Sequence, residues 1–211
     1  MTKPSSINKP ILWLASASPQ RAALLAQIGI VPDKIYSADI DESPYENELP
    51  RQYVARMALT KARYIHQSHK KEKKAQLFIL AADTVIATGR TILPKAQTRE
   101  TAETCLTHLS ARSHRVYGGI CLLAGAREIV KTIITRVQMK RLAQNEIATY
   151  LASDEWQDKA GGYAIQGRAG RFVRAIHGSY SNIVGLPLYE TAMLLQGAGY
   201  NIDERAHNSD K

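Results

Sequence analysis

The sequence predicts a mixed α/β fold, in which flanking helices cover a twisted sheet and two lobes surround a central cleft. Three stretches support this prediction. Residues 11–15 form a short apolar run that passes directly into a helix-forming segment, as in α/β proteins. Residues 78–86 are rich in aliphatic and β-branched side chains, which is typical of a buried strand. Residues 114–137 alternate apolar and polar positions around a central turn, which predicts an antiparallel hairpin.

The length and composition indicate a soluble globular protein. A chain of 211 residues is long enough for one large domain with an ample core. We expect this domain to span residues 11–200, between a disordered tail at residues 1–10 and a loose polar tail at residues 201–211. No apolar run reaches membrane-spanning length, and residues 1–10 lack the apolar centre of a signal peptide. We therefore expect no membrane contact and a cytoplasmic location.

The net charge of +9 favours an anionic partner. The basic residues are scattered, and the densest run, at residues 70–74, is expected to be a solvated loop between a helix and a strand. Nucleic-acid binding would favour a basic stripe interleaved with aromatic side chains, which this sequence lacks. A small polyanion such as a nucleotide would equally favour a basic cleft, so we expect that partner and no nucleic acid.

The first strand, residues 11–15, delivers small hydroxylated residues to the start of a helix. Ser18 is a good N-cap, Pro19 suits the first helical position, and Gly29 ends the helix. The free N–H groups of a helix N-terminus attract anions, and here Ser16 and Ser18 add donors while Arg21 adds a positive charge. Strand–loop–helix turns are common, but this one is equipped to bind an anion.

A weak second strand at residues 35–38 leads into an acidic stretch, residues 39–44, that is expected to form a loop. The carboxylates of this loop, Glu42 among them, either bind a divalent cation or are simply solvated. Pro50 then opens a long helix, and Lys61 falls on or beside its apolar face. A lysine in that position either extends its amine outward to solvent or contacts phosphate in a cleft.

The central strand, residues 78–86, carries Asp83 in its middle. An unpaired buried carboxylate is costly, so this group needs a metal, a cation or several donors, unless it caps a turn at the end of the strand. A turn at residues 89–91 sends residues 92–95 back toward the same end of the sheet. Lys95 is therefore expected near Asp83.

Further along, helices are predicted at residues 98–109 and 145–151, with Thr98 as the N-cap of the first. His108 and His114 have no partner at metal-binding spacing, and we expect no metal on them. Cys105 and Cys121 lie in apolar patterns, with neither metal spacing nor the density of a disulfide scaffold. Both are expected to be buried thiols.

Residues 158–167 form a glycine-rich block that contains Lys159 and Gln166. Its glycines would let the backbone approach a ligand, although a simple glycine-rich hairpin would also explain them. A strand at residues 172–176 and an apolar helix at residues 188–195 complete the domain.

The charged and hydroxyl residues discussed above are expected to come together near the ends of the strands. Carboxylates, several cations and a helix N-terminus are together what metal-assisted phosphoryl or nucleotidyl chemistry needs. The cations would stabilise charge on phosphate oxygens while a carboxylate holds a divalent ion or deprotonates water. The sequence has no Gly-Lys-Ser/Thr phosphate loop, which argues against a P-loop nucleotidase.

Five blocks in the same order resemble the signature of the Maf family of nucleoside triphosphate pyrophosphatases, which are related in fold to the inosine triphosphate pyrophosphatases. They are Leu-Ala-Ser-Ala-Ser-Pro-Gln-Arg within residues 11–29, Asp-Glu-Ser-Pro at 41–44, Ala-Ala-Asp-Thr-Val at 81–85, and the stretches 158–167 and 178–187. The resemblance covers the chain from the first strand to the last helix, and it implies an inosine triphosphate pyrophosphatase-like fold.

The resemblance implies that water attacks the α-phosphorus of a nucleoside triphosphate, which yields the monophosphate and pyrophosphate with Mg²⁺ or Mn²⁺ as cofactor. Asp83 matches the proton acceptor, and Glu42 would join it as a metal ligand. The matching phosphate- and metal-binding positions are Ser18, Arg21, Glu42, Lys61, Lys95 and Lys159.

Gln20, Thr84 and Gln166 match the positions that select the base. Thr84 and Gln166 resemble the subfamily that takes dTTP and UTP, whereas Gln20 stands where that subfamily usually has Arg. Lys95 is followed by Ala96 in place of the usual Pro.

The resemblance also implies a homodimer and a house-cleaning role in nucleotide metabolism. A rival hypothesis is a nucleotide-binding regulator of septum formation that does not need hydrolysis. A carboxylate beside the phosphates favours an enzyme, because binding alone would not need one.

Overall fold

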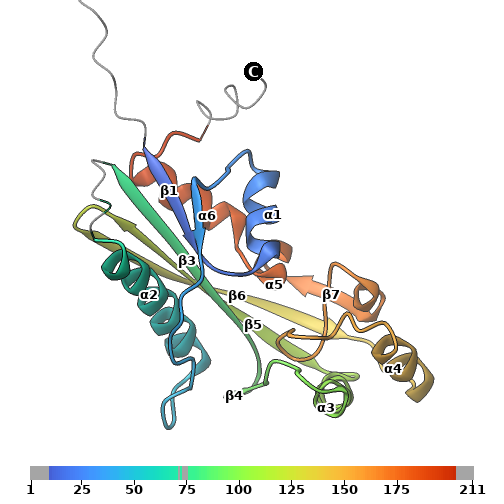
Figure 1. Cartoon of the computed structure of the whole chain (residues 1–211). Helices are drawn as coiled ribbons and strands as arrows, with labels where there is room; N and C mark the ends of the chain where they lie inside the picture. The colour runs from blue at the N-terminus through green and yellow to red at the C-terminus, as the bar shows by residue number, and fades with distance from the viewer. Residues whose placement is uncertain (1–9, 71, 73–75, 203–211) are drawn as a thin grey trace, which may run out of the picture.

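The structure, a computed structural model, describes residues 10–70, 72 and 76–202, and a seven-stranded mixed sheet runs through them (Figure 1). The strand order is β2-β1-β3-β5-β6-β7, and β4 pairs with β3. The strands are β1 (Ile11–Ala15), β2 (Lys34–Tyr36), β3 (Leu77–Thr88), β4 (Thr91–Ile92), β5 (Ser113–Ala124), β6 (Arg127–Met139) and β7 (Val173–His177). The helices are α1 (Pro19–Gln27), α2 (Pro50–Ser68), α3 (Arg99–Leu109), α4 (Gln144–Leu151), α5 (Tyr180–Val184) and α6 (Leu188–Gly197), with a 3₁₀ helix at Arg168–Phe172.

The predicted mixed α/β class is confirmed. Strand β1 runs parallel to β2 and β3, whereas β5, β6 and β7 continue the sheet in antiparallel order. The register pairs Ala15 with Ala81. Strand β3 therefore continues past the end of β1, and Asp83 lies just beyond the point where the chain leaves β1 at Ser16.

Helices cover both faces of the sheet (Figure 1). Because side chains alternate along β1, Leu12 and Leu14 pack in the core beneath α1 and α6, whereas Trp13 packs beneath α2. Complete burial of such a side chain stabilises the folded state by about 1.5–3 kcal/mol. Because helices bury both faces of these strands, the strand sequences are nearly continuous apolar runs.

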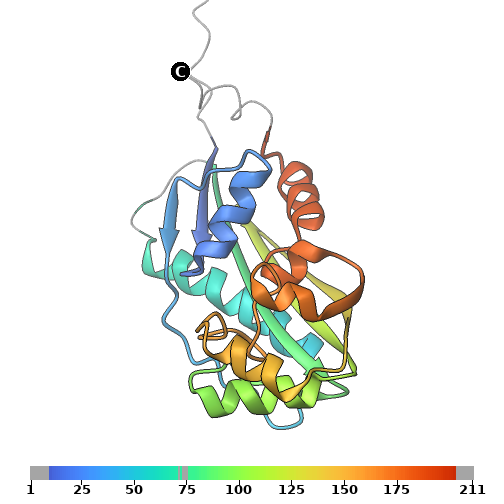
Figure 2. The ribbon, with the colours of Figure 1, turned by 90° about the vertical axis from the view of Figure 1, so that its right-hand side faces the viewer.

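A separate apolar cluster lies at the other end of the sheet, where α3 and α4 lie side by side (Figure 2). It joins Leu106 of α3 and Tyr150 of α4 to Phe172, and each of these side chains is fully buried. The two ends of the molecule form the two lobes that the sequence predicts, and segments from both line the cleft described below.

Helix α2 lies unusually close to the sheet at Gly119, the residue opposite Asp83 on β5. A Cβ atom at Gly119 would lie 2.1 Å from the carbonyl oxygen of Val54, so any larger residue would push the helix away. Since Lys61 reaches Asp83 from this helix, the close approach at Gly119 sets the distance between two charged groups of the site.

The helix boundaries follow the predictions, with one change in how an end is stabilised. Helix α1 begins at Pro19, but the Ser18 hydroxyl does not cap it and instead donates to Gln20 Oε1 at 3.0 Å. Thr98 does cap α3, because its hydroxyl accepts a hydrogen bond from the Thr101 N–H at 3.2 Å.

Two expectations needed adjustment, and two short elements were not predicted. The second strand spans residues 34–36 and not 35–38. The predicted return strand at residues 92–95 is reduced to β4, because Pro94 has no N–H to donate, and Lys95 instead forms a single bridge to Ala160. The short helix α5 and the 3₁₀ helix were not predicted. Of the basic run at residues 70–74, only Lys70 and Glu72 lie among the described residues.

Both cysteines are buried free thiols, as predicted. Burial raises the pKa of Cys121 to about 12. The two histidines discussed above form ordinary hydrogen bonds: His108 lies 2.8 Å from the Thr88 hydroxyl, and His114 lies 2.7 Å from the Tyr163 hydroxyl.

The buried His114 ring predicts a loss of stability in mild acid. Burial lowers its pKa to about 4, below the ordinary value of 6.5. The folded state therefore favours neutral imidazole, and this stability is fully present above pH 6.5 and is lost as the pH falls toward 4. We expect the free energy of unfolding to fall by about 2 kcal/mol between pH 7.5 and 5. Urea unfolding at the two pH values measures this, and the decrease should be largely absent in His114→Phe. An equal decrease in that variant would assign the effect to other groups.

Candidate active site

A cavity of about 190 Å³ opens where the two lobes meet, beyond the carboxyl end of β1 and beside the middle of β3. This is where open α/β sheets usually bind ligands. The predicted site residues on its wall are Ser18, Gln20, Arg21, Lys61, Asp83, Thr84, Lys95, Lys159 and Gln166. Two further predicted residues, Ser16 and Glu42, touch these through hydrogen bonds. The structure thus brings the predicted site residues together from distant parts of the chain.

A chain of alternating charges forms the centre of the site. The Lys61 ammonium lies 2.7 Å from Asp83 Oδ1 and 2.6 Å from Glu42 Oε1. The other Glu42 oxygen lies 2.8 Å from the Lys95 ammonium. Asp83 and Lys61 are only 4% and 6% exposed, so each needs the other to compensate its charge. The expected proximity of Lys95 to Asp83 is therefore indirect, through Glu42 and Lys61.

The two ammonium groups keep Glu42 ionised. Partial burial would raise the pKa of this carboxyl, but the hydrogen bonds from Lys61 and Lys95 outweigh that effect and lower the pKa to about 2. At neutral pH Glu42 is therefore a fixed negative charge at the rim of the cavity, and its oxygens can accept either a lysine or a metal ion.

Arg21 lies on the wall of the same cavity, and its side chain is held by the predicted anion-binding loop and by the loop that contains Gly185. Its guanidinium donates to Ser16 Oγ at 2.8 Å and to the carbonyl oxygen of Gly185 at 2.9 Å. The Thr84 hydroxyl lies 3.5 Å away and also donates to Gly185. Burial lowers the pKa of Arg21 from its ordinary value, and the negative charges of Asp83 and Glu42 partly offset that effect. The arginine side chain is thus oriented before any ligand arrives.

The predicted base-selecting residues lie on the wall of the same cavity. The Gln20 amide oxygen accepts the Ser18 hydroxyl. Gln166 follows a buried segment of the glycine-rich block and is itself exposed. Gly161 and Gly162 of that block have φ values of 63° and 69°, which favour glycine, so the backbone itself requires them there.

Lys159 lies on the wall of the cavity but outside the chain of charges. Its ammonium donates to the carbonyl oxygen of Gln157 at 3.1 Å. The backbone around it is tied to the Lys95 segment, because Ala96 N–H donates to the Lys159 carbonyl at 3.0 Å. These bonds hold the two lysines on one wall.

Sequence reasoning missed two contributors to the site. The Gly185 carbonyl binds both Arg21 and Thr84, and no side-chain pattern could reveal a backbone acceptor. Tyr53 is buried on the inner face of α2, and its hydroxyl donates to the Glu42 carbonyl at 2.7 Å. A tyrosine at the edge of an apolar face was the available signal, since a buried hydroxyl usually finds a partner.

The donor set fits a divalent ion that is completed by substrate. Among the described residues, no group of three or more His, Cys, Asp or Glu side chains forms a ready-made metal site. Asp83 and Glu42 do place hard carboxylate oxygens on both sides of Lys61. Mg²⁺ commonly uses one or two carboxylates together with water and substrate phosphates, so this pair suffices for such an ion.

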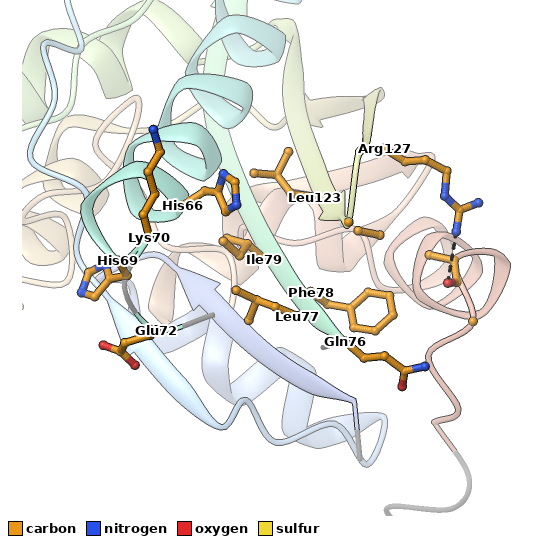
Figure 3. Close-up of a pocket in the computed structure, with 14 residues that line it drawn as sticks. His66, His69, Lys70, Glu72, Gln76, Leu77, Phe78, Ile79, Leu123 and Arg127 are labelled. Carbon is orange, nitrogen blue, oxygen red and sulfur yellow. Dashed lines mark hydrogen bonds between the residues drawn. The ribbon is translucent and has the colours of Figure 1, made fainter. Parts of the chain in front are cut away.

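A larger cavity, of about 600 Å³, lies at the far end of the sheet (Figure 3). It is bordered by the C-terminal end of α2, the start of β3 and the turn between β5 and β6. Its floor is apolar, with Leu77, Ile79 and Leu123, and Arg127 on its rim donates to the Ala198 carbonyl at 3.2 Å. Glu72 is the one carboxylate on the described wall, so this cavity lacks paired acids facing cations and is not the candidate site.

The fold and the smaller cavity define a mixed α/β protein whose cleft is suited to a polyphosphate and a divalent cation. The chain belongs to the Maf family: the family model described as Maf-like protein matches residues 11–198. The resemblance noted from the sequence is therefore confirmed.

Two curated relatives share about half of their residues with this chain. A protein of Rhodospirillum rubrum named dTTP/UTP pyrophosphatase is 55% identical over 190 residues, which cover 90% of this chain and 88% of the relative. A Mesorhizobium japonicum protein with the same name is 54% identical over 195 residues, which cover 92% and 94%. Among solved structures, a HAM1 protein from Coxiella burnetii has a TM-score of 0.46 at 16% identity, covering 64% of this chain and 75% of that one.

Over the residues that the structure describes, no helix is both long and apolar enough to cross a membrane.

Proposed function

We propose that this protein is a nucleoside triphosphate pyrophosphatase that cleaves between the α- and β-phosphates. The observation that carries the proposal is the chain of charges from Asp83 through Lys61 and Glu42 to Lys95, which faces Arg21 in one cavity. A site that only bound a nucleotide would gain little from a buried carboxylate beside the phosphates, whereas hydrolysis needs a base for water.

In this mechanism the cations neutralise the triphosphate and Asp83 activates water. Arg21, with the Ser16 and Ser18 hydroxyls, binds phosphate oxygens on one wall, and Lys61, Lys95 and Lys159 bind them on the other. Asp83 orients the attacking water and accepts its proton as the bond to the α-phosphorus forms. The bond to the bridging oxygen breaks, and pyrophosphate leaves with charge that the lysines stabilise.

We assign the divalent cation, Mg²⁺ or Mn²⁺, to Asp83 and Glu42. When bound, such an ion polarises phosphate oxygens and lowers the pKa of a bound water molecule. Glu42 would hold the ion with the same carboxylate oxygens that accept Lys61 and Lys95. A lysine freed from Glu42 would be available to bind phosphate.

The names of the curated relatives favour dTTP and UTP as substrates, and Thr84 and Gln166 agree with that preference. At Gln20, the amide oxygen is engaged by Ser18, so the amide nitrogen is the atom that can donate to a base. A donor suits the 4-oxo group of uracil or thymine and does not suit the 4-amino group of cytosine. We therefore propose that Gln20 supports pyrimidine preference without the usual arginine. Modified pyrimidine triphosphates remain candidate substrates for a house-cleaning role.

The test is the release of pyrophosphate from a panel of ordinary and modified nucleoside triphosphates, each with EDTA, Mg²⁺ or Mn²⁺. We expect pyrophosphate and monophosphate as products, more than tenfold faster with metal, and a higher kcat/KM for dTTP and UTP than for dCTP. Release of inorganic phosphate instead would contradict attack at the α-phosphorus. Tight nucleotide binding without any turnover would favour the regulatory hypothesis.

We also propose that the protein works in the cytoplasm as a homodimer, without a nucleic-acid partner. The support is the family membership and the scattered arrangement of its basic residues.

A further inference from the structure

Glu42 lies on a loop, residues 39–49, that is fastened to helix α2 at several points. We call these residues the acidic loop. The Tyr53 hydroxyl donates to the Glu42 carbonyl at 2.7 Å. One helical turn further on, Arg56 donates to the Ser43 carbonyl at 3.0 Å, so two consecutive carbonyl groups of the loop are held to the helix.

Arg56 also binds the far end of the acidic loop. Its Nε and Nη2 atoms lie 2.7 Å and 2.6 Å from the two carboxylate oxygens of Glu48, a bidentate pair. Glu48 in turn accepts the Tyr45 N–H at 3.0 Å, and the Arg56 guanidinium lies 3.8 Å from the centre of the Tyr45 ring. Arg56 therefore joins the middle of the loop to its end and stacks against a third part.

This arginine pair is more sheltered than an ordinary surface ion pair. The side chains of Arg56 and Glu48 are 21% and 7% exposed, whereas those of Arg63 and Glu128, an ion pair further along α2, are 51% and 41% exposed. The hydrogen bond from Arg56 lowers the pKa of Glu48. Exposed pairs contribute little, but a sheltered bidentate pair can hold a loop in one place.

We propose that Arg56 is a positioning residue that holds the acidic loop so that Glu42 lies between Lys61 and Lys95. This inference rests on the proposed function, because it concerns how Glu42 is presented to the divalent cation and the triphosphate. Arg56 itself does not touch the chain of charges; it acts through the loop backbone at Ser43 and through Glu48.

The position of the acidic loop has opposite effects on turnover and on nucleotide binding without metal. With the loop held, Glu42 is in place to bind the cation, which favours turnover. In the absence of that cation, however, Glu42 occupies Lys61 and Lys95 and competes with phosphate oxygens for both. Loosening the loop should therefore weaken catalysis while it improves metal-free binding of the nucleotide.

The variant Arg56→Met tests this pair of effects. We expect kcat with Mg²⁺ and dTTP to fall about 10–100-fold, the loss typical of a misplaced catalytic group. In EDTA, binding of an α,β-methylene dTTP analogue, measured by calorimetry, should tighten by about 3-fold or more as Lys61 and Lys95 are released. A merely structural role would reduce turnover and analogue binding together, and that result would overturn the proposal.

Three further variants keep the test decisive. Arg63→Met removes the exposed Arg63–Glu128 pair from the same helix and should change neither measurement. Arg56→Lys keeps the charge but cannot bridge the Glu48 oxygens and Ser43 at once, so it should resemble Arg56→Met more than the wild type. Tyr53→Phe, which removes one hydroxyl, should change both measurements in the same directions by less, and it replaces Arg56→Met if that variant does not fold.

The outcomes separate this proposal from the proposed function. A wild-type protein that releases no pyrophosphate from any triphosphate overturns the proposed function, and the analogue-binding arm still tests the loop. A catalytically active wild type whose kcat and metal-free binding are both unchanged by Arg56→Met overturns the positioning role alone.

Discussion

Replacing Asp83 with asparagine is expected to lower kcat for pyrophosphate release by about 10²–10⁴-fold, the usual contribution of a general base. Asparagine has almost the same shape, and its amide oxygen can still accept the Lys61 ammonium, which also keeps Glu42 as a partner. An amide cannot accept a proton from water at neutral pH, however, and it is a weak metal ligand. Nucleotide binding should therefore survive while turnover is lost.

Measurements of kcat and of analogue binding on Asp83→Asn check this result. Asp154→Asn is the matched control, because Asp154 is exposed and lies outside the wall of the cavity, while the chemical change is the same. Its φ of 56° is also a conformation that asparagine tolerates well. Turnover close to the wild-type rate in Asp83→Asn would remove Asp83 from the catalytic role.

The variant Lys61→Met should abolish activity and also destabilise the fold. Removal of the ammonium leaves Asp83, which is 4% exposed, without the cation that compensates it, and leaves Glu42 as a second negative charge nearby. Loss of one partner from a buried ion pair typically costs about 3–5 kcal/mol. For a protein of this size that corresponds to a decrease in Tm of about 6–20 °C, which differential scanning fluorimetry measures.

The double variant Lys61→Met/Asp83→Asn distinguishes loss of the ion pair from loss of packing. If the unpaired Asp83 charge causes the destabilisation, neutralising it should recover more than half of the lost Tm, although the double variant remains inactive. If both variants have equally low Tm values, the methylene chain of Lys61 and its packing account for the loss instead.

Much of the fold follows from local pattern. The strand at residues 11–15, the helix that begins at Pro19, the long helix from Pro50 and the hairpin at residues 113–139 were all predicted in type and nearly in boundary. These elements have strong periodicity and clear end signals, and their conformations are set mostly by neighbouring residues. The failures were the short elements, such as α5 and β4, whose few residues depend on distant partners.

The candidate site was predicted unevenly for the same reason. Asp83 was identifiable because an acid in an apolar strand needs compensation, and Lys61 because it falls on a buried helical face. That Glu42 bridges Lys61 and Lys95 could not be predicted, because a loop has no periodicity to orient its side chains. The contacts of Arg56 with Ser43 and Glu48 were not predicted, since an arginine on the side of a helix usually faces solvent.

By itself, the sequence determined the class of fold, the family and the list of chemical groups available to the cleft. These depend on residue type and spacing, which the sequence gives without any knowledge of tertiary contacts. Only the tertiary structure decided which groups come into contact. Lys61 pairs with two acids, the Gly185 carbonyl holds Arg21, and Gly119 lets α2 approach Asp83. The physical reason is that the strength of charge interactions and hydrogen bonds changes over distances of a few ångströms. Those distances are set by the packing of elements that lie far apart in the sequence.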